Sequence, residues 1–468
     1  MNNQRENIIV QGHPPRKRKM LMKNREQFSG NLSVIMAMAG SAIGLGNIWR
    51  FPYIVGEYGG AAFIIVYFAA CLFIALPIFY AETIIGRRGG LDTYGSMKRL
   101  APGTHWYKLG LLTIISPMLI LSYYSVVGGW SIHYLFKSVS GTVGQETGQF
   151  SEFISSVEAP ILAHTVFVIL VAAIILGGVK KGIEKFSKIT MPILFFLILV
   201  IVVYSLTLPG AGGGVDYLVR PDFSKLTGGA IASAVGQAFF SLSLGVGTVL
   251  TYASYMRKQD NILVSGLGTA GFDFLFALLA GFAVMPAVFA AGLSPSSGPG
   301  LVFETLPYIF GKMGAGSVWL TACVAGVFFL AVLMAALSSA ISILEVGVAY
   351  LVEEKGLGRS RATLYLSLFA WAVGLLCSLS FGPLADFKIL GSSIFEFLDK
   401  LCSNWMMPLG GLLFTLFVGW KMPSADVLDE FSNGGSKPWN VKIYPFVRVL
   451  LRYVAPIGII FIFLNSVL

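Results

Sequence analysis

Residues 40–52, reading GSAIGLGNIWRFP, combine groups that can bind ions with residues that weaken a helix. They lie inside an apolar run that is otherwise suited to crossing a membrane. Glycine costs a helix about 1 kcal/mol relative to alanine, and Pro52 lacks a backbone donor. Asn47 and Arg50 add polar groups, and non-helical backbone at membrane depth is tolerated only where protein or water satisfies it. We therefore predict a broken helix whose freed backbone groups bind an ion and a substrate. The alternative is close helix packing through the GxxxG pair in this stretch.

A second stretch, residues 236–247 (GQAFFSLSLGVG), also places glycines and hydroxyls within an apolar run. With about 20 apolar residues per membrane helix, the first stretch falls in the first span and this one in the sixth. The odd offset means that the two spans cross the membrane in opposite directions. Interrupted helices at corresponding positions of two halves predict an inverted-repeat transporter. The repeats would cover about 30–209 and 226–419, with a final helix at 445–466 outside the symmetry.

The whole composition is that of a membrane protein. Of 468 residues, 56% are hydrophobic and only 12% are charged, and the mean hydropathy is +0.77. Soluble proteins carry about 25% charged residues. The expected fold is all-α and polytopic, with about eleven membrane helices in a transporter domain at 29–468, after a basic segment at 1–28. The expected spans are 30–52, 60–86, 106–138, 160–177, 189–209, 226–254, 261–290, 316–350, 361–381, 394–419 and 445–466.

The net charge of +10 reflects topology, because lysines and arginines gather in alternate loops. This positive-inside pattern predicts a cytoplasmic N-terminus and places the long connections outside. It also indicates contact with anionic membrane lipid, and it argues against nucleic-acid binding. The four cysteines and four histidines are scattered, without metal, redox or nucleophile–base spacing, so no enzyme is expected.

Several longer stretches strengthen the transporter prediction: GSAIGLGNIWRFPY followed by GEYGGAAF, KGIEKFSKITMP, VGQAFFSLSLGVG, TYASYMRK and AALSSAISILE. With them the chain resembles a bacterial member of the neurotransmitter:sodium symporter family, which shares its fold with the bacterial leucine transporter. The matching stretches occur in the same order as in the family, and the resemblance extends from Arg25 to the last span. It implies a multi-pass protein of the bacterial inner membrane, with sodium as the coupling ion. The assembly expected is a monomer or a homodimer.

The resemblance implies two sodium sites. The second would use carbonyls of Gly40, Ile43 and Ala335 with the hydroxyls of Ser338 and Ser339, and neutral oxygens of this kind bind an ion reversibly. Taken without the resemblance, the two serines would more often form hydrogen bonds between helices than bind an ion.

The first sodium site would use the Ala42 carbonyl, Asn47, Ser241 and Asp273, where asparagine is common in the family. An ionisable residue inside a span is a functional candidate by default, and sodium would favour its charged form. Relatives that need chloride have a serine one turn later, whereas this chain has Ala277. Because Asp273 would supply the negative charge, we predict that chloride is not required.

For the substrate, the resemblance implies an amino acid held mainly by backbone. Its carboxylate would meet the amide groups of Leu45 and Gly46 and the Tyr124 hydroxyl, at the positive end of a half-helix. Its ammonium would meet carbonyls of Ala42, Phe240 and Ser241. Tyr124 could instead be an interfacial aromatic. The remaining pocket candidates carry no charge, which favours an apolar or aromatic amino acid; they are Gly44, Ile120, Ser243, Val246, Ser339 and Ile343.

Two gates are implied. At the outer gate Arg50 would pair with Asp399, or alternatively with Glu396, and Phe240 and Tyr124 would form a lid. At the inner gate Arg25 would pair with Glu353, braced by Tyr255, although Arg25 could simply be one more cytoplasmic positive charge.

Gly182 and Pro192 flank the start of the fifth span. Family members with this spacing can unwind there and admit water to the second sodium site, and glycine and proline are where helix hydrogen bonds are most easily lost. Proline near a helix start is also ordinary, so both interpretations stay open.

The predicted function is sodium-coupled import of a hydrophobic or aromatic amino acid by alternating access. The nearest alternative is a proton-coupled or uncoupled transporter of the same fold, in which Asp273 titrates. A non-transporting amino-acid sensor or a channel is the further alternative, and the paired gates and short polar tails argue against both.

Overall fold

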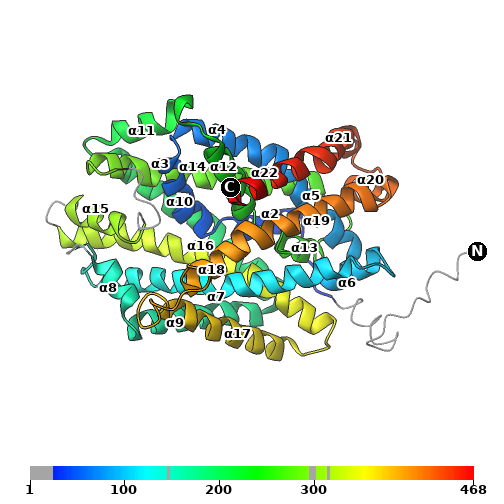
Figure 1. Ribbon diagram of the computed structural model, residues 1–468, viewed down its shortest axis with the longest axis horizontal. Helices are drawn as coiled ribbons and strands as arrows, with labels where there is room; N and C mark the ends of the chain where they lie inside the picture. Colours follow the sequence, from blue (N-terminus) through cyan, green and yellow to red (C-terminus); the bar gives the residue numbers. More distant parts are fainter. Residues whose placement is uncertain (1–24, 145–147, 295–301, 314–316, 468) are drawn as a thin grey trace, which may run out of the picture.

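The protein is an all-α bundle in the computed structural model, which describes residues 25–144, 148–294, 302–313 and 317–467 (Figure 1). Over these ranges the only β pairing is an isolated bridge between Ile389 and Ser392. Most of the predicted basic segment, residues 1–24, lies outside the described part of the chain.

Nine helices of the described chain are long and apolar enough to cross a membrane. They are Ala61–Gly89 (α4, η2 and α5), Tyr107–Val139 (α7), Glu158–Leu176 (α9), Val179–Leu206 (η3 and α10), Ile262–Ala290 (α14), Val318–Glu353 (α16), Arg359–Leu379 (α17), Ile394–Lys421 (α18, η6, α19 and η7) and Pro438–Asn465 (α21, η8 and α22). Together with two interrupted spans they account for the eleven that the sequence predicts.

The two interrupted spans lie where the sequence places them. In the first, α2 (Asn31–Ala42) ends and the chain resumes as η1 (Gly46–Arg50) and α3 (Phe51–Glu57), with a bend of 52° between the two parts. In the second, α12 (Gly228–Ser241) and α13 (Thr248–Ala253) are joined by six non-helical residues. Gly245 and Gly247 have positive φ angles there, which glycine adopts readily and a helix does not contain. The expectation of broken first and sixth helices is confirmed.

The broken spans are held among the long helices. In Figure 1, α7 and α16 run side by side along the molecule, and they share an extensive interface. On one side α7 also packs against α9 and α17, and α2 contacts α10, α14 and α16. The broken segments are therefore enclosed by protein, which is the condition for non-helical backbone at membrane depth.

Several boundaries differ from the sequence prediction. The fifth span begins at Val179 rather than at 189, because it opens with the π-helical turn η3 (Val179–Glu184). The last span begins at Pro438 rather than at 445. The connection between the expected spans 394–419 and 445–466 contains the helix α20 (Ser424–Ser432), and hydropathy alone does not reveal so short an amphipathic helix.

The long connections predicted to lie outside also contain short helices. These are α8 (Gln149–Ser155), α11 (Ala211–Val219) with the 3₁₀ turn η4 (Phe223–Lys225), and α15 (Thr305–Met313). On the opposite side, α6 (Thr93–Leu100) connects the second and third spans.

Candidate functional site

A small cavity of about 30 Å³ lies where the two broken helices meet. It is lined by Ala42, Gly44, Gly46, Ile120, Tyr124, Phe240, Ser243, Val246, Ser339, Ile343 and Met407. Ten of these eleven residues are the ones predicted to contact substrate. Met407 was missed, because a methionine in an apolar span carries no sequence signal of its own.

Two further predicted residues, Leu45 and Ser241, lie beside the cavity rather than in its lining. The backbone N–H of Leu45 donates to the Tyr124 hydroxyl at 3.2 Å. Tyr124 is buried beside the break in the first span, so it is not an interfacial aromatic. Since Leu45 precedes the half-helix that begins at Gly46, its N–H belongs to the positive end of that helix.

The glycines of the first break leave room for the cavity. A Cβ atom on Gly44 would lie 2.3 Å from the Ser339 Oγ and 2.8 Å from the Tyr124 hydroxyl, and one on Gly46 would lie 2.8 Å from the Phe240 ring. A Cβ on Gly40 would instead meet the side chains of helix α10 at ordinary contact distances. Gly44 therefore keeps space open for the cavity. Gly40 is compatible both with the predicted site and with close helix packing.

Three predicted ligands of the first sodium site are brought together and fully buried. The Asp273 carboxylate accepts the Ser241 hydroxyl at 2.8 Å and the Asn47 Nδ2 at 2.8 Å. The Tyr67 hydroxyl donates to it at 3.4 Å. Among the described residues Asp273 forms no ion pair, so these donors are all uncharged. A buried carboxylate without a countercharge is costly, and a bound cation such as sodium would supply that charge.

Gln237 and Ala277 lie near the predicted first sodium site and bear on the predicted independence from chloride. Gln237 donates its amide to the carbonyl of Gly46 at 2.9 Å, and its Oε1 is buried with no partner in the described part of the chain. Ala277 is fully buried and offers no hydroxyl. The carboxyl group of Asp273 lies against Tyr67 and Ser241.

Three oxygens of the predicted second sodium site lie together. The Ser338 hydroxyl donates to the carbonyls of Ile43 at 3.2 Å and Ala335 at 2.9 Å. The neighbouring Ser339 hydroxyl donates instead to the carbonyl of Ser41 at 2.8 Å. Gly40 lies beside Ser338, where a Cβ would come within 3.7 Å of the serine side chain.

The start of the fifth span lies next to this site. Ser187 and Met191 of α10 (Lys185–Leu206) are the side chains that face Gly40. Gly182 lies in η3, so close to the Ile174 carbonyl that a Cβ would approach it to 2.2 Å, and Pro192 lies inside α10. All of this segment is helical in the present structure, and its unwinding stays a prediction.

Glu82 supports the second break and was missed at the sequence level. This fully buried carboxylate of α5 (Leu76–Gly89) accepts the backbone N–H of Gly245 at 2.7 Å. It therefore stabilises a peptide group that the break leaves without a helical partner. A carboxylate within LPIFYAETIIG was the signal that could have revealed it.

The inner-gate residues are in contact. A guanidinium nitrogen of Arg25 lies 2.8 Å from the Glu353 carboxylate, and the same group lies 4.6 Å over the Tyr255 ring. Burial, the largest single effect, lowers the pKa of Arg25, but Glu353, Tyr255 and Asp92 together outweigh it, so the pKa is raised overall. Arg25 is thus more than a topological charge.

Behind this pair lies a second ion pair that the sequence analysis missed. The Tyr255 hydroxyl donates to Glu345 at 2.8 Å, and Arg359 pairs with the same carboxylate at 2.5 Å. Glu345 ends the stretch AALSSAISILE and is fully buried. A charge inside an apolar span was again the available signal.

The outer-gate residues are not paired in this structure. In the described chain no ion pair joins Arg50 to Asp399 or Glu396; instead Arg50 lies 5.0 Å over the Phe240 ring. Asp399 accepts the Ser403 hydroxyl at 3.0 Å, and Glu396 caps α18 (Ile394–Lys400) together with Ser393. Arg50 and Phe240 also line an outer cavity of about 160 Å³. The predicted inner gate is therefore closed, whereas the ion pair predicted for the outer gate is not formed.

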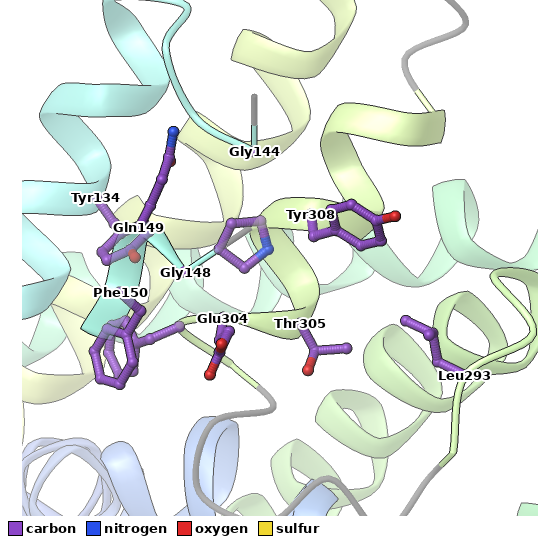
Figure 2. A pocket seen from close by; sticks show the side chains of 11 residues that line it. Tyr134, Gly144, Gly148, Gln149, Phe150, Leu293, Glu304, Thr305 and Tyr308 are labelled. Carbon is purple, nitrogen blue, oxygen red and sulfur yellow. The ribbon is translucent and has the colours of Figure 1, made fainter. Parts of the chain in front are cut away.

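A larger cavity of about 210 Å³ lies elsewhere, between α7 and the loops that carry α8 and α15 (Figure 2). Tyr134, Gln149, Phe150, Glu304 and Tyr308 project around it (Figure 2). It contains none of the predicted site residues, so cavity size alone does not locate the site.

Two interrupted helices that meet at a buried set of neutral oxygens and one carboxylate, between two gates, define a membrane transporter. Comparison with known proteins supports this class. The model of the sodium:neurotransmitter symporter family matches residues 25–155 and 145–468. The chain is 38% identical over 446 residues to the sodium-dependent transporter YhdH of Bacillus subtilis (strain 168), covering 94% of this chain and 97% of that one.

Comparison with other relatives and with solved structures agrees. The crystal structure of MhsT in complex with L-phenylalanine is 42% identical, with a TM-score of 0.86 over 95% of this chain and 100% of that chain. The sodium-dependent serotonin transporter of Drosophila melanogaster is 28% identical over 505 residues, covering 95% of this chain and 77% of the fly protein. The chain belongs to the sodium:neurotransmitter symporter family. It is a multi-pass, sodium-coupled membrane transporter of a small molecule, not an enzyme.

Proposed function

We propose that this transporter imports a hydrophobic or aromatic amino acid together with sodium, by alternating access. The observation that carries this proposal is the cavity at the two helix breaks. It combines backbone groups that suit a zwitterion with side chains that are uncharged. That MhsT was crystallised with L-phenylalanine supports the same substrate class.

In this proposal the substrate carboxylate binds the Leu45 and Gly46 amide groups, with Tyr124 and sodium beside them. The Leu45 N–H, which donates to Tyr124 in this structure, would turn to the carboxylate. The ammonium binds carbonyls of Ala42, Phe240 and Ser241. Main-chain groups then recognise the part that all α-amino acids share.

The side chain of the substrate would enter the apolar part of the pocket, formed by Ile120, Val246, Ile343 and Met407 with Ser243 and Ser339. A charged substrate side chain would lose its hydration there without gaining a partner. Differences of one methylene are worth only about 1–3 kcal/mol in such a pocket, so several apolar amino acids should compete.

Two sodium ions would bind beside the substrate, without a chloride requirement. The first takes Ala42, Asn47, Ser241 and Asp273, and the second takes Gly40, Ile43, Ala335, Ser338 and Ser339. The N-terminus would face the cytoplasm of a bacterial cell, with anionic lipid around the basic loops and the chain acting as a monomer or homodimer.

The decisive experiment is a thermal-shift panel of the twenty amino acids on the purified protein, in sodium and then in potassium. Stabilisation by a few apolar or aromatic amino acids in sodium alone is expected. Equal stabilisation in both salts would contradict sodium coupling at this site. Stabilisation only by charged or small polar amino acids would contradict the proposed substrate class.

A further inference from the structure

Asp92 is a fully buried carboxyl group at the inner gate that the transport mechanism above does not use. It precedes α6, where its Oδ1 accepts the backbone N–H groups of Tyr94 and Gly95 at 3.0 and 3.2 Å. Its own N–H donates to Glu353 at 2.7 Å, and Glu353 is the partner of Arg25. Asp92 is therefore joined directly to the closed gate.

The second oxygen of this carboxyl group has no hydrogen-bond partner among the residues that the structure describes. Asp92 Oδ2 is buried and unpaired, whereas Oδ1 is satisfied by two amide groups. An atom at the Cβ position of Gly95 would lie 2.8 Å from Oδ2 and 2.9 Å from the Glu354 Oε1, so these two carboxyl oxygens share one small space beside α6. Two unprotonated carboxylates would repel one another there.

Within the described part of the chain, carboxyl groups outnumber cations around Asp92. The Arg25 cation acts on it against the carboxyl groups of Glu353 and Glu354. The other charged groups of the packed elements are engaged elsewhere: Lys98 lies over Tyr94, Lys355 over Tyr350, Arg99 donates to Gly89, Arg88 pairs with Asp426 and Asp429, and Arg359 pairs with Glu345. Burial, with the charges of Glu353 and Glu354, raises the pKa of Asp92 to about 8.

We propose that Asp92 is a proton-binding site of the inner gate, protonated on Oδ2 when the gate closes, so that the gate senses pH on its own side of the membrane. The proposal rests on the proposed alternating-access function, in which the Arg25–Glu353 pair separates. Opening admits water, the carboxyl group ionises, and the proton returns to the compartment from which it came. The proton does not cross the membrane, so this is regulation rather than proton coupling.

The direction of the pH effect follows from linkage. The closed gate binds one more proton than the open gate wherever the pH lies between the ordinary aspartate pKa and the raised value. Closure is therefore favoured at lower pH on that side and is weakened as the pH rises through about 8. Between pH 7 and pH 9 the ratio of closed to open gates should fall about tenfold.

The test uses Thr251→Cys as a reporter of gate opening. Thr251 is buried one helical turn before Tyr255, and a cysteine there should react with a thiol reagent from the inner side only when the gate opens. Labelling rates are measured at pH 7 and pH 9 with Asp92 present and with Asp92→Asn. Since thiol chemistry responds to pH equally in both proteins, the comparison isolates the gate. Asparagine retains the Oδ1 acceptor and is a good helix N-cap, so the fold should persist.

With Asp92 present, the increase in labelling rate from pH 7 to pH 9 should exceed that of Asp92→Asn by about tenfold. Equal increases would overturn the proposal. Glu354→Gln removes one repelling charge and should move the transition to lower pH; an unmoved transition would likewise count against it. Sodium-dependent labelling and uptake, measured in the same proteins, test alternating access separately. Their loss with a persisting pH difference would contradict the function and leave the proton site standing.

Discussion

At the scale of single residues, the cavity depends on an absent side chain. Gly44 has no positive φ angle, so its backbone does not require glycine. Glycine is needed at this position because Ser339 and Tyr124 leave too little space for a side chain, and a Cβ would overlap both hydroxyls.

Gly44→Ala is expected to weaken amino-acid binding at least tenfold, because the methyl group must displace the two hydroxyls. Gly271→Ala is the control, since a Cβ there meets nothing within 4 Å on the outer surface of α14. Sodium-dependent thermal shift with the best amino acid measures both. Equal affinity in the two variants would show that the cavity is not the binding site.

Asp273→Asn is expected to weaken sodium binding at least tenfold and to make it responsive to chloride. The substitution removes the carboxylate that Ser241 and Tyr67 contact, which leaves room and donors for an external anion. Sodium titrations in chloride and in gluconate measure the effect. The control is Asp222→Asn, an exposed acid of the outer loop that should change neither titration. A chloride requirement in the unmodified protein would refute the prediction.

At the scale of elements, the fifth span is tied to the inner gate by the segment that carries Arg25. Glu26 accepts the N–H of Val179 at 2.6 Å, and Glu184 accepts the N–H of Ser29 at 3.1 Å. The first residues before α2 and the π-turn η3 therefore hold one another. A movement of this segment that separates Arg25 from Glu353 also frees the beginning of the fifth span.

Pro192→Ala tests whether this span must unwind. Alanine restores a backbone donor and favours the helix by about 3 kcal/mol, so unwinding becomes rarer. Turnover is expected to fall several-fold while the affinity for the amino acid stays unchanged. Pro445→Ala in α21 (Pro438–Val449) is the control for a helix-interior proline away from the site. Unchanged uptake with Pro192→Ala would argue that the span stays helical during transport.

At the scale of the whole molecule, α20 joins distant parts of the chain on the same side as the predicted inner gate. Arg87 at the end of the second span pairs with Glu430 at 2.6 Å, with side chains only 1% and 4% exposed. Lys258, before the seventh span, pairs with the same carboxylate at 3.0 Å. A helix from the loop before the last span thus ties the second and seventh spans together.

Glu430→Ala should lower the stability of the purified protein by about 3–5 kcal/mol, because Arg87 is left as an unpaired buried charge. Asp426→Ala removes a partner of Arg88 on the same helix whose side chain is 46% exposed, and it should cost less than about 1 kcal/mol. Thermal unfolding in detergent compares the two. Similar losses would mean that α20 is not a structural tie.

Much of the site could be predicted because its residues are polar or weaken a helix, whereas the spans around them are apolar. Glycines, Asn47 and Asp273 stand out in apolar spans, and the motifs place them in one family order. Glu82 and Glu345 carried the same signal and were overlooked, whereas Met407 carried none. The first residues of the fifth and last spans were predicted too late in the chain, and the helix α20 was not predicted. Hydropathy measures burial in lipid and does not show where a helix begins.

The sequence by itself determined the membrane class, the two breaks and the residue types available for ions and substrate, since these follow from local composition and helix chemistry. Only the tertiary structure decided which of them meet. Asn47, Ser241 and Asp273 come from three spans and touch because those spans pack together. The same holds for both gates. Distances between segments far apart in the chain decide that Arg25 contacts Glu353, that Arg50 does not pair with Asp399, and that one oxygen of Asp92 is unpaired among the described residues. Such distances are set by packing, which no local pattern encodes.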